Sequence, residues 1–333
     1  MQMSLPLWRP PVAAGALLRR APPAAARPAA GDWYSRDAAI MGTAIHVELW
    51  AERRCDADVA LEAVMAEMHR IDHRYSPHLP GSELSRLNRS AGRAAFAVSD
   101  EMFFLLGSAL AFAELSDGAF DISYAAIGRL YDYRNGVAPD DTTLAKARTR
   151  VGWRGIQLHR ATRSVRFAQE GMCIDLGGFA KGHAVDCAAA RLKALGIRHA
   201  YISAGGDSRV IGDRRGRPWS VAIRHPRRAD EVVAVLPLED VAVSTSGDYE
   251  RFFERDGVRH HHLIDPSTGR SPTQVHSVSI VAEDGLTSEA LSKTVFVLGV
   301  ERGLAIVEQM SGADAVVVDA NGQLHFTSGL QAH

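Results

Sequence analysis

Two hydrophobic periodicities divide the chain into predicted strands and helices. Alternation of apolar and polar residues indicates strands, whereas apolar residues three or four positions apart indicate amphipathic helices. Alternation predicts strands over 40–50, 172–176, 199–203, 219–224, 231–236, 241–245 and 276–282, and hairpins over 154–167 and 315–326. Helical spacing predicts helices over 56–73, 99–115, 179–195, 288–298 and 301–309. Because strands and helices are mixed without strict alternation, the predicted fold class is α+β, with mixed sheets and packed helices.

Residues 1–30 differ from the rest of the chain, with six prolines, nine alanines, four arginines and no acidic residue. Proline at this density interrupts backbone hydrogen bonding, and alanine buries little apolar area. We therefore expect a disordered leader over 1–32 and a single folded domain over 33–333, which two lobes would also fit. The apolar stretch over 12–18 is short for a secretory signal, and no lipoprotein cysteine precedes Cys55. On sequence alone we expect a cytoplasmic location.

The composition excludes several classes of protein. Of the 333 residues, 46% are hydrophobic and 23% are charged, which suits a globular chain with a substantial core. Lys and Arg number 38 against 39 Asp and Glu, so no net field attracts nucleic acid or an anionic membrane. Three cysteines are too few for a disulfide framework or a CxxC zinc site. We therefore expect no nucleic-acid partner from the balanced charge. No apolar run reaches about 18 residues, so we also expect no transmembrane segment.

The segment over 173–182 has the pattern of a phosphate site. A predicted strand delivers Asp175, the pair Gly177-Gly178 follows, and a predicted helix then begins with Lys181 in its first turn. Free amides and the positive dipole end of a helix favour an anion, and lysine adds a point charge. The segment is neither a GxGxxG nor a Walker A motif. An ordinary strand-to-helix turn with a surface lysine is the alternative.

Four further segments carry polar residues at predicted element ends. Gly205-Gly206-Asp207 follows a strand, which suggests a second backbone concavity or a plain turn. In the run over 260–262 three histidines are adjacent, but at strand spacing only His260 and His262 share a side, which favours one histidine as an acid or base over a metal cluster. The segment over 116–121 reads as a capped helix end. Glu289 and Lys293 are spaced for a surface ion pair on a helix.

Taken together and in this order, these segments resemble the ApbE family of FAD:protein FMN transferases. Further matches are the segments over 41–43, 82–88, 244–247, 249–253 and 295–299. The resemblance implies an ApbE-like fold and an enzyme that cleaves FAD, attaches FMN through a phosphoester bond to a Thr or Ser hydroxyl of a target protein, and releases AMP. It also implies a divalent cation, usually Mg²⁺, and a flavin-acceptor partner such as a redox or electron-transfer subunit.

The resemblance also implies roles for individual residues. His262 matches the catalytic histidine, the base that the acceptor hydroxyl needs. His78 stands where the family has Tyr or Trp against the flavin. The residues that match FAD contacts are Met41, His78, Ala119, Phe120, Asp121, Asp175, Lys181 and Ile264. The expected metal ligands are the Gly178 carbonyl, Glu289 and Ser292.

Lys293 is the departure from the family pattern. The family has Asp at the place of Glu289 and Thr at the place of Lys293, both as metal ligands, and an ammonium cannot ligate a cation. Three arrangements are possible. Lys293 points away, and Ser292 or water takes its place as a metal ligand. Alternatively, Lys293 replaces one cation and binds phosphate itself, or Thr294 becomes the metal ligand after a shift of about 100° around the helix.

Two other functions are weighed against transfer. A non-catalytic FAD-binding protein of the same fold is the main alternative, and the pair of Glu289 with Lys293 is the feature that separates the two. A nicotinamide-dependent oxidoreductase is disfavoured because no GxGxxG follows a first strand. The chain contains no Ser-Gly-Ala-Thr acceptor segment, so we do not expect self-modification. Family resemblance adds a periplasmic or membrane-associated location to the cytoplasmic one expected above.

Overall fold

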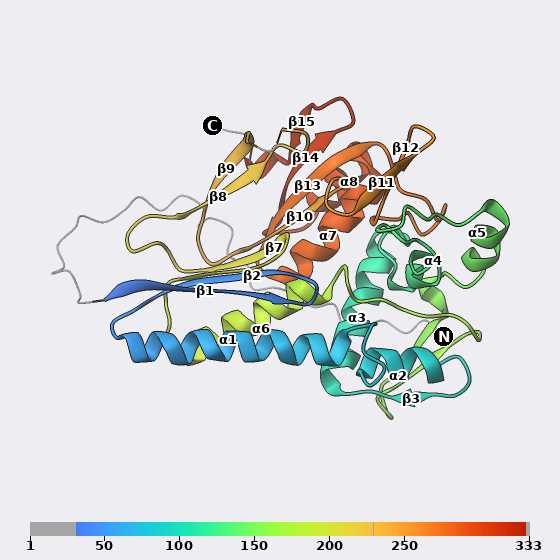
Figure 1. Ribbon diagram of the computed structural model, residues 1–333, viewed down its shortest axis with the longest axis horizontal. Coiled ribbons are helices and arrows are strands. Elements are labelled where there is room, and N and C mark those ends of the chain that lie inside the picture. The colour runs from blue at the N-terminus through green and yellow to red at the C-terminus, as the bar shows by residue number, and fades with distance from the viewer. Residues whose placement is uncertain (1–30, 229, 331–333) are drawn as a thin grey trace.

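The computed structural model of the chain describes residues 31–228 and 230–330 (Figure 1). The predicted leader over 1–32 lies outside the described residues except for its last two positions. Asp32 already begins the first strand. None of the helices in these ranges is long and apolar enough to cross a membrane.

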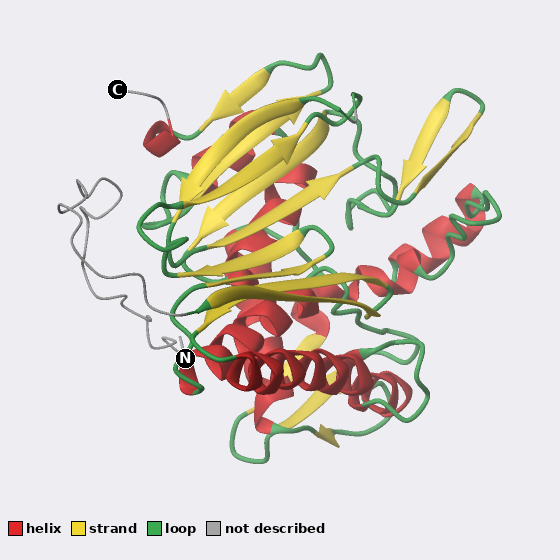
Figure 2. Ribbon diagram, turned by 60° about the vertical axis from the view of Figure 1, so that its left-hand side comes forward, coloured by secondary structure: helices red, strands yellow, loops and turns green. Residues whose placement is uncertain are grey.

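An eight-stranded sheet forms the centre of the fold (Figure 2). Every neighbouring pair in it is antiparallel. The strands, in spatial order, are β1 (Asp32–Ile40), β2 (Thr43–Ala51), β6 (Ala200–Ala204), β7 (Asp207–Ile211), β10 (Ala242–Gly247), β13 (Val275–Ala282), β14 (Asp314–Asp319) and β15 (Leu324–Phe326). Successive side chains of a strand point to opposite faces of the sheet, and both faces carry apolar side chains. Other elements must therefore cover each face.

Helices cover one face of this sheet, and a hairpin lies against the other. The covering helices are α1 (Arg54–Tyr75), α6 (Ala180–Ala194), α7 (Gly285–Leu298) and α8 (Val300–Val307), and α3 (Asp100–Leu115) packs against α7. On the opposite face, β8 (Trp219–Arg224) and β9 (Val232–Leu238) pack Trp219 and Leu236 against Val210 and Val316 of the sheet. The core is thus divided over both faces of the sheet.

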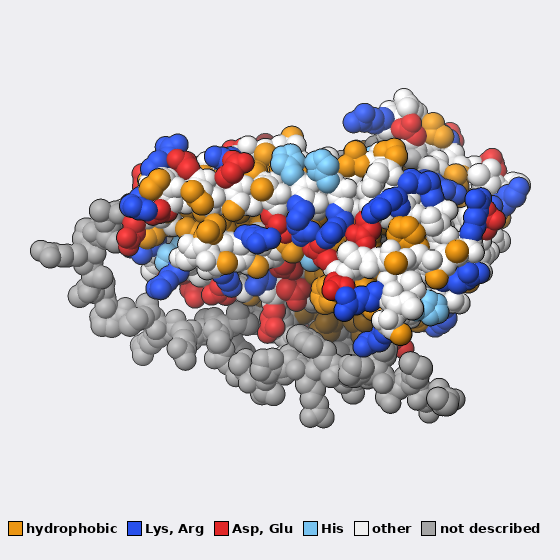
Figure 3. All heavy atoms as spheres, turned by 90° about the horizontal axis from the view of Figure 1, so that it is seen from below, with side chains coloured by type: hydrophobic (Ala, Val, Ile, Leu, Met, Phe, Trp, Pro, Cys, Tyr) orange, Lys and Arg blue, Asp and Glu red, His pale blue; other side chains and the backbone are white. Residues whose placement is uncertain are grey.

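Smaller elements complete the molecule. A three-stranded sheet consists of β3 (Phe96–Ala97), β5 (Ser164–Phe167) and β4 (Ile156–His159), and a separate hairpin consists of β11 (Phe252–Arg255) and β12 (Val258–His261). The short helices are α2 (Glu83–Ser90), α4 (Ala125–Gly128) and α5 (Asp141–Arg148), with 3₁₀ turns at Ile122–Tyr124, Trp153–Gly155 and Ser328–Leu330. On the face shown in Figure 3 acidic and basic side chains are interspersed, in line with the formal net charge of −1.

The predicted α+β class is confirmed, and most predicted elements end within two or three residues of the observed ones. The strand predicted over 40–50 is present as β2, but the sequence did not predict its partner β1; Met41 and Gly42 take positive φ angles of 55° and 67° and reverse the chain between the two strands. The strand predicted over 172–176 is wrong. This segment joins no sheet, and the Asn88 side chain bonds both the amide and the carbonyl of Ile174 at 2.8 Å.

Helices α6 and α7 approach each other closely at the point that matters for the site. A Cβ added at Gly182 would lie 2.1 Å from the carbonyl oxygen of Gly285, so only glycine fits there. One turn further along α6, the Asp186 carboxylate accepts hydrogen bonds from the amides of Gly285 and Leu286 at 2.8–3.1 Å, and thereby caps α7. Burial raises the pKa of Asp186 to about 6. This contact sets Lys181 of α6 against Glu289 of α7.

Candidate active site

A single large cleft contains most of the residues predicted from the sequence. It lies between the β1–β2 turn, the start of α6, the 119–133 segment and the end of β12, and has a volume of about 1470 Å³. This exceeds the roughly 300–1,000 Å³ of common small-molecule pockets, so it has room for a dinucleotide. The predicted residues that line it are Met41, His78, Ala119, Phe120, Asp121, Asp175, Gly178, Lys181, His262 and Ile264. Glu289 and Ser292 do not line it, whereas Lys293 does.

The wall formed by the 119–133 segment is held by a buried carboxylate. Asp121 accepts hydrogen bonds from the amides of Ser123 and Trp153, both at 2.8 Å. Burial raises the pKa of Asp121, and these hydrogen bonds oppose the rise. Phe120 packs against Phe179, with ring centroids 5.5 Å apart. Asp121 therefore acts through the backbone that it orders, with both carboxylate oxygens engaged.

The turn before α6 is rich in backbone donors, but the protein already uses some of them. The Asp175 carboxylate accepts the Gly177 amide at 2.5 Å, and burial raises the pKa of Asp175. The Gly182 amide bonds Glu289 Oε2 at 2.7 Å. The prediction of a free helix N-terminus is therefore wrong at Gly182. In the part of the chain that the structure describes, the Gly178 amide meets no acceptor.

Two lysines and two buried carboxylates meet at the base of the cleft. We call Lys181, Asp207, Glu289 and Lys293 the lysine–carboxylate cluster. The Lys181 ammonium contacts Asp207 Oδ2 at 2.8 Å, the Gly177 carbonyl at 3.2 Å and Glu289 Oε1. An ammonium has three donors, so Lys181 is fully engaged. Burial disfavours its charge, but Asp207 and Glu289 hold the pKa of Lys181 above its usual value.

Asp207 belongs to the cluster, although the sequence predicted only a turn or a backbone concavity for Gly205-Gly206-Asp207 and no role for this side chain. Its carboxylate is 2% exposed, and its Oδ1 has no hydrogen-bond partner. Burial opposes ionisation, yet the charges of Lys181 and Lys293 keep the pKa of Asp207 below its usual value. A carboxylate directly after a Gly-Gly pair at a strand end was the available signal.

Lys293 does not swing away from the cluster. Its ammonium lies 3.4 Å from both Glu289 Oε1 and Ser292 Oγ, and it remains 18% exposed to the cleft. The predicted ion pair with Glu289 is therefore present, but Glu289 is fully buried and the pair is not on the surface. The Thr294 alternative is wrong, because that hydroxyl is buried and donates to the Ala290 carbonyl at 2.9 Å.

His262 follows β12 directly and faces the cleft. Its amide donates to the Arg251 carbonyl at 3.1 Å, which fixes the backbone, while its Nδ1 is buried without a partner. Burial, together with the charges of Lys293 and Arg251, lowers the pKa of His262 to about 3. The imidazole is therefore neutral near pH 7 and keeps a lone pair for a proton.

The other two adjacent histidines have structural surroundings. His260 stacks on Phe253, with ring centroids 4.9 Å apart, and does not line the cleft, so it does not share a site with His262. His261 is buried against Phe296 and bonds the Pro272 carbonyl at 2.9 Å. The prediction of one useful histidine in this run agrees with this geometry.

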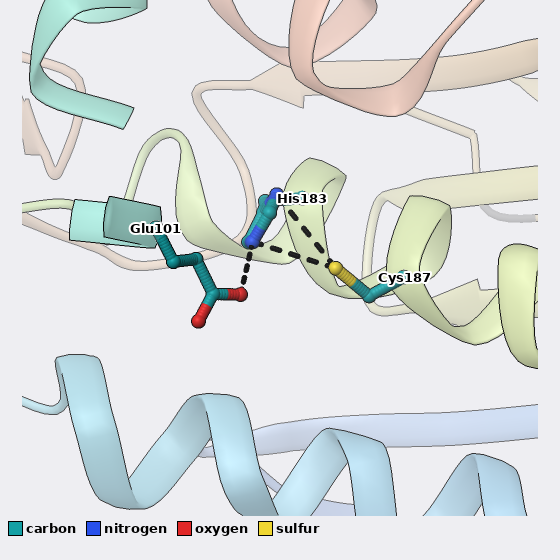
Figure 4. Close-up of side chains that lie close together, drawn as sticks. All are labelled: Glu101, His183 and Cys187. Carbon is teal, nitrogen blue, oxygen red and sulfur yellow. Dashed lines mark hydrogen bonds and ion pairs between the residues drawn. The ribbon is translucent and has the colours of Figure 1, made fainter. Parts of the chain in front are cut away.

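Glu101, His183 and Cys187 lie close together (Figure 4), and none of them lines the cleft. Glu101 Oε1 is 2.8 Å from His183 Nε2, but the carboxylate also receives Arg70 and Arg74 at 2.6–2.7 Å. Burial, followed by nearby carboxylates, raises the pKa of Cys187 to about 12, so the thiol stays protonated. With its oxygens occupied by two guanidinium groups, this cluster is an ion-pair network and offers no site to a metal.

The fold and the cleft together define an α+β protein that can hold a phosphate-bearing nucleotide beside a neutral imidazole. Comparison with known proteins identifies the family that this chain matches. The model of the ApbE family matches residues 41–317. A relative named FAD:protein FMN transferase from Treponema pallidum is 35% identical over 316 residues, covering 89% of this chain and 87% of the relative.

Solved structures agree with this match. The ApbE protein of Thermotoga maritima superposes with a TM-score of 0.84 at 32% identity, covering 90% of this chain and 98% of that one. The structure named flavin transferase ApbE from Vibrio cholerae gives a TM-score of 0.82 at 26% identity, covering 90% and 99%. This chain belongs to the ApbE family.

Proposed function

We infer that this chain is an FAD:protein FMN transferase. It cleaves FAD and attaches FMN through a phosphoester bond to a Thr or Ser hydroxyl of another protein, with release of AMP. The relatives from Treponema pallidum and Rhodobacter capsulatus, at 35% and 34% identity, both carry the name of this activity. The observation that carries the proposal is the neutral His262 imidazole in the same cleft as the Gly178 amide and the Lys293 ammonium.

The chemistry requires a base and a positive environment. The acceptor oxygen attacks the phosphorus of the FMN half, the bond from that phosphorus to the bridging oxygen breaks, and that oxygen leaves with AMP. The hydroxyl proton passes to the His262 imidazole. A pKa of about 3 makes this imidazole a weak base in the free protein. The two negative charges of a bound pyrophosphate would raise that pKa and so strengthen the base.

The remaining cleft residues fall into two groups, one for the flavin end of FAD and one for its pyrophosphate. We propose that Met41, His78, Phe120 and Ile264, which provide apolar or ring surface, hold the flavin end together with Ala119 and the Asp121 backbone. We assign the pyrophosphate to the Gly177-Gly178 turn. Asp175 orders that turn through the Gly177 amide. Lys181 supplies charge to the turn while its donors stay on protein acceptors.

Family resemblance implies Mg²⁺, but the expected ligands do not fit a divalent cation. Glu289 Oε1 is engaged by Lys181 and Lys293, and Glu289 Oε2 by the Gly182 amide. The Ser292 hydroxyl donates to the Glu289 carbonyl at 2.8 Å and faces Ser246 Oγ at 2.8 Å and Lys293 at 3.4 Å. No step of the mechanism above passes through a metal.

We propose a separate flavin-acceptor protein, such as a redox or electron-transfer subunit. The cytoplasmic location expected from the sequence alone, and the periplasmic or membrane-associated alternative, can be decided by fractionating cells that express the full chain.

The test is transfer of flavin to a protein that bears a Ser-Gly-Ala-Thr acceptor segment. Wild-type protein, FAD and this acceptor are incubated with and without Mg²⁺, and fluorescence is read in a denaturing gel. We expect a labelled acceptor band, and a rate for His262→Ala that is roughly 10²–10⁴-fold lower at nearly unchanged FAD affinity. His260→Ala is the matched control and should transfer normally. Bound yellow FAD without a labelled band would indicate a binding protein instead, and equal loss of binding and transfer would make His262 structural.

A further inference from the structure

Lys293 has the position and the free capacity to act on a phosphate. Lys181, the other lysine of the lysine–carboxylate cluster, has three close protein acceptors for its three donors. Both contacts of the Lys293 ammonium are long, at 3.4 Å, so its hydrogen-bonding capacity is far from used. Lys293 also lines the cleft, whereas Glu289 and Ser292 lie behind it. Lys181 lines the cleft as well, but its donors are engaged, so Lys293 is the ammonium of the cluster with donors left for a ligand.

The same side chain contacts two of the three residues expected to hold a divalent cation and passes beside the third. Its ammonium contacts Glu289 and Ser292, and its Cε lies 3.6 Å from the point that a Cβ would occupy at Gly178. An ammonium therefore lies against the two side chains that would have to supply oxygen ligands. A second cation here would also be repelled by two ammonium groups within the same low-dielectric pocket.

The charges of the cluster balance without a metal. Lys181 and Lys293 contribute two positive charges, and Asp207 and Glu289 contribute two negative ones. Both carboxylates are buried, at 2% and 0% exposure, while the two lysines remain 22% and 18% exposed. The two positive charges are therefore the more exposed ones, since Glu289 does not line the cleft and Asp207, which does, is only 2% exposed. This is the arrangement that attracts a pyrophosphate.

We propose that the Lys293 ammonium takes the place of a divalent cation at the FAD pyrophosphate, so that this chain binds FAD and transfers FMN without a divalent metal. The inference rests on the proposed function and deepens it. In this role the ammonium donates to a pyrophosphate oxygen and neutralises charge that develops on the departing AMP phosphate. Glu289 contacts both lysines, and Asp207 contacts Lys181.

The first test measures metal and FAD binding rather than activity. Full-length protein is titrated with Mn²⁺ alone and followed by electron paramagnetic resonance, and FAD affinity is measured in EDTA and in excess Mg²⁺. We expect no stoichiometric Mn²⁺ site and an FAD affinity that changes by less than about threefold between the two conditions. Stoichiometric Mn²⁺ binding, or FAD binding that needs Mg²⁺, would overturn the inference.

Variants give a second, independent readout. Lys293→Thr removes the ammonium and supplies an oxygen, so we expect FAD affinity in EDTA to fall by roughly tenfold or more and to recover with Mg²⁺. Lys293→Arg keeps the charge and should retain metal-independent binding. Lys193→Thr, on the exposed side of α6, is the control and should match wild type. An unchanged affinity for Lys293→Thr in EDTA would contradict the proposal. FAD binding by no form under any condition would overturn the proposed function and this inference together.

Discussion

At the scale of single residues, environment rather than residue type assigns the roles. Three histidines stand side by side in the sequence, yet one stacks on Phe253, one packs on Phe296 and one enters the cleft. Alternation along a strand predicted that His260 and His262 would share a side, but β12 ends at His261 and the pattern no longer applies beyond it. The resemblance to a family selected His262, and the fold explains its neutral state through burial and neighbouring cations.

The His262 pKa provides a prediction about proton binding. In the free protein burial and nearby cations hold it at about 3, so we expect the His262 ring proton to keep its neutral chemical shift as the pH falls through about 6.5, where a free histidine titrates. Added FAD brings negative charge and should raise this pKa. NMR titration with and without FAD measures both values, and His262→Ala assigns the resonance. A free-protein pKa near 6.5, or a lower value with FAD, would contradict this account.

At the scale of elements, the sequence predicted α6 and α7 but not their contact. Periodicity indicates which face of a helix is buried, but it does not indicate which element that face packs against. The contact depends on Gly182 and Gly285, whose missing side chains let the backbones meet, and on Asp186, which caps the neighbouring helix. The segment over 172–176 shows the opposite failure. Its apolar pattern is that of a strand, but a side chain on α2 takes the hydrogen bonds that a strand would supply.

The helix contact predicts the effect of one added methyl group. Gly182→Ala places a Cβ against the Gly285 carbonyl, so we expect a loss of roughly 1–3 kcal/mol in the free energy of unfolding and weaker FAD binding, because Lys181 and Glu289 move apart. Denaturant unfolding and FAD titration measure the two effects. Gly107→Ala in α3 is the control, since a Cβ there meets nothing within 4 Å, and it should gain about 0.5–1 kcal/mol. Equal stability changes in the two variants would show that the close approach is unimportant.

At the scale of the whole molecule, ion pairs join helices that are far apart in the sequence. Glu101 of α3 binds Arg70 and Arg74 of α1. It also contacts His183 of α6 (Figure 4). Although burial opposes its charge, these partners hold the pKa of Glu101 far below its usual value. A carboxyl group with a lowered pKa contributes stability above its unfolded pKa, about 4.3, and that stability is lost as the pH falls below this value.

Removal of the Glu101 charge should therefore destabilise the protein in a pH-dependent way. We expect Glu101→Gln to lower the free energy of unfolding near pH 7 by roughly 1–3 kcal/mol, because Arg70 and Arg74 lose one partner and keep only Glu67 and Glu83. The difference from wild type should shrink as the pH falls below about 4. Glu62→Gln, which breaks an exposed pair with Arg36, is the control and should cost less than about 1 kcal/mol. Denaturation series at several pH values measure this, and a pH-independent difference would argue against an electrostatic origin.

Apolar periodicity and short motifs are local properties of the chain, so the sequence alone predicts the α+β class, most helices and strands, and the family. Which polar groups meet depends on the tertiary packing. Lys181 pairs with a carboxylate 108 positions away, Asp207 joins them from β7, and Lys293 lies over Gly178. These contacts arise from the packing of α6 and α7 against the sheet. The distance between two packed helices depends on the volumes of the side chains between them, and the spacing of residues along the chain does not encode it.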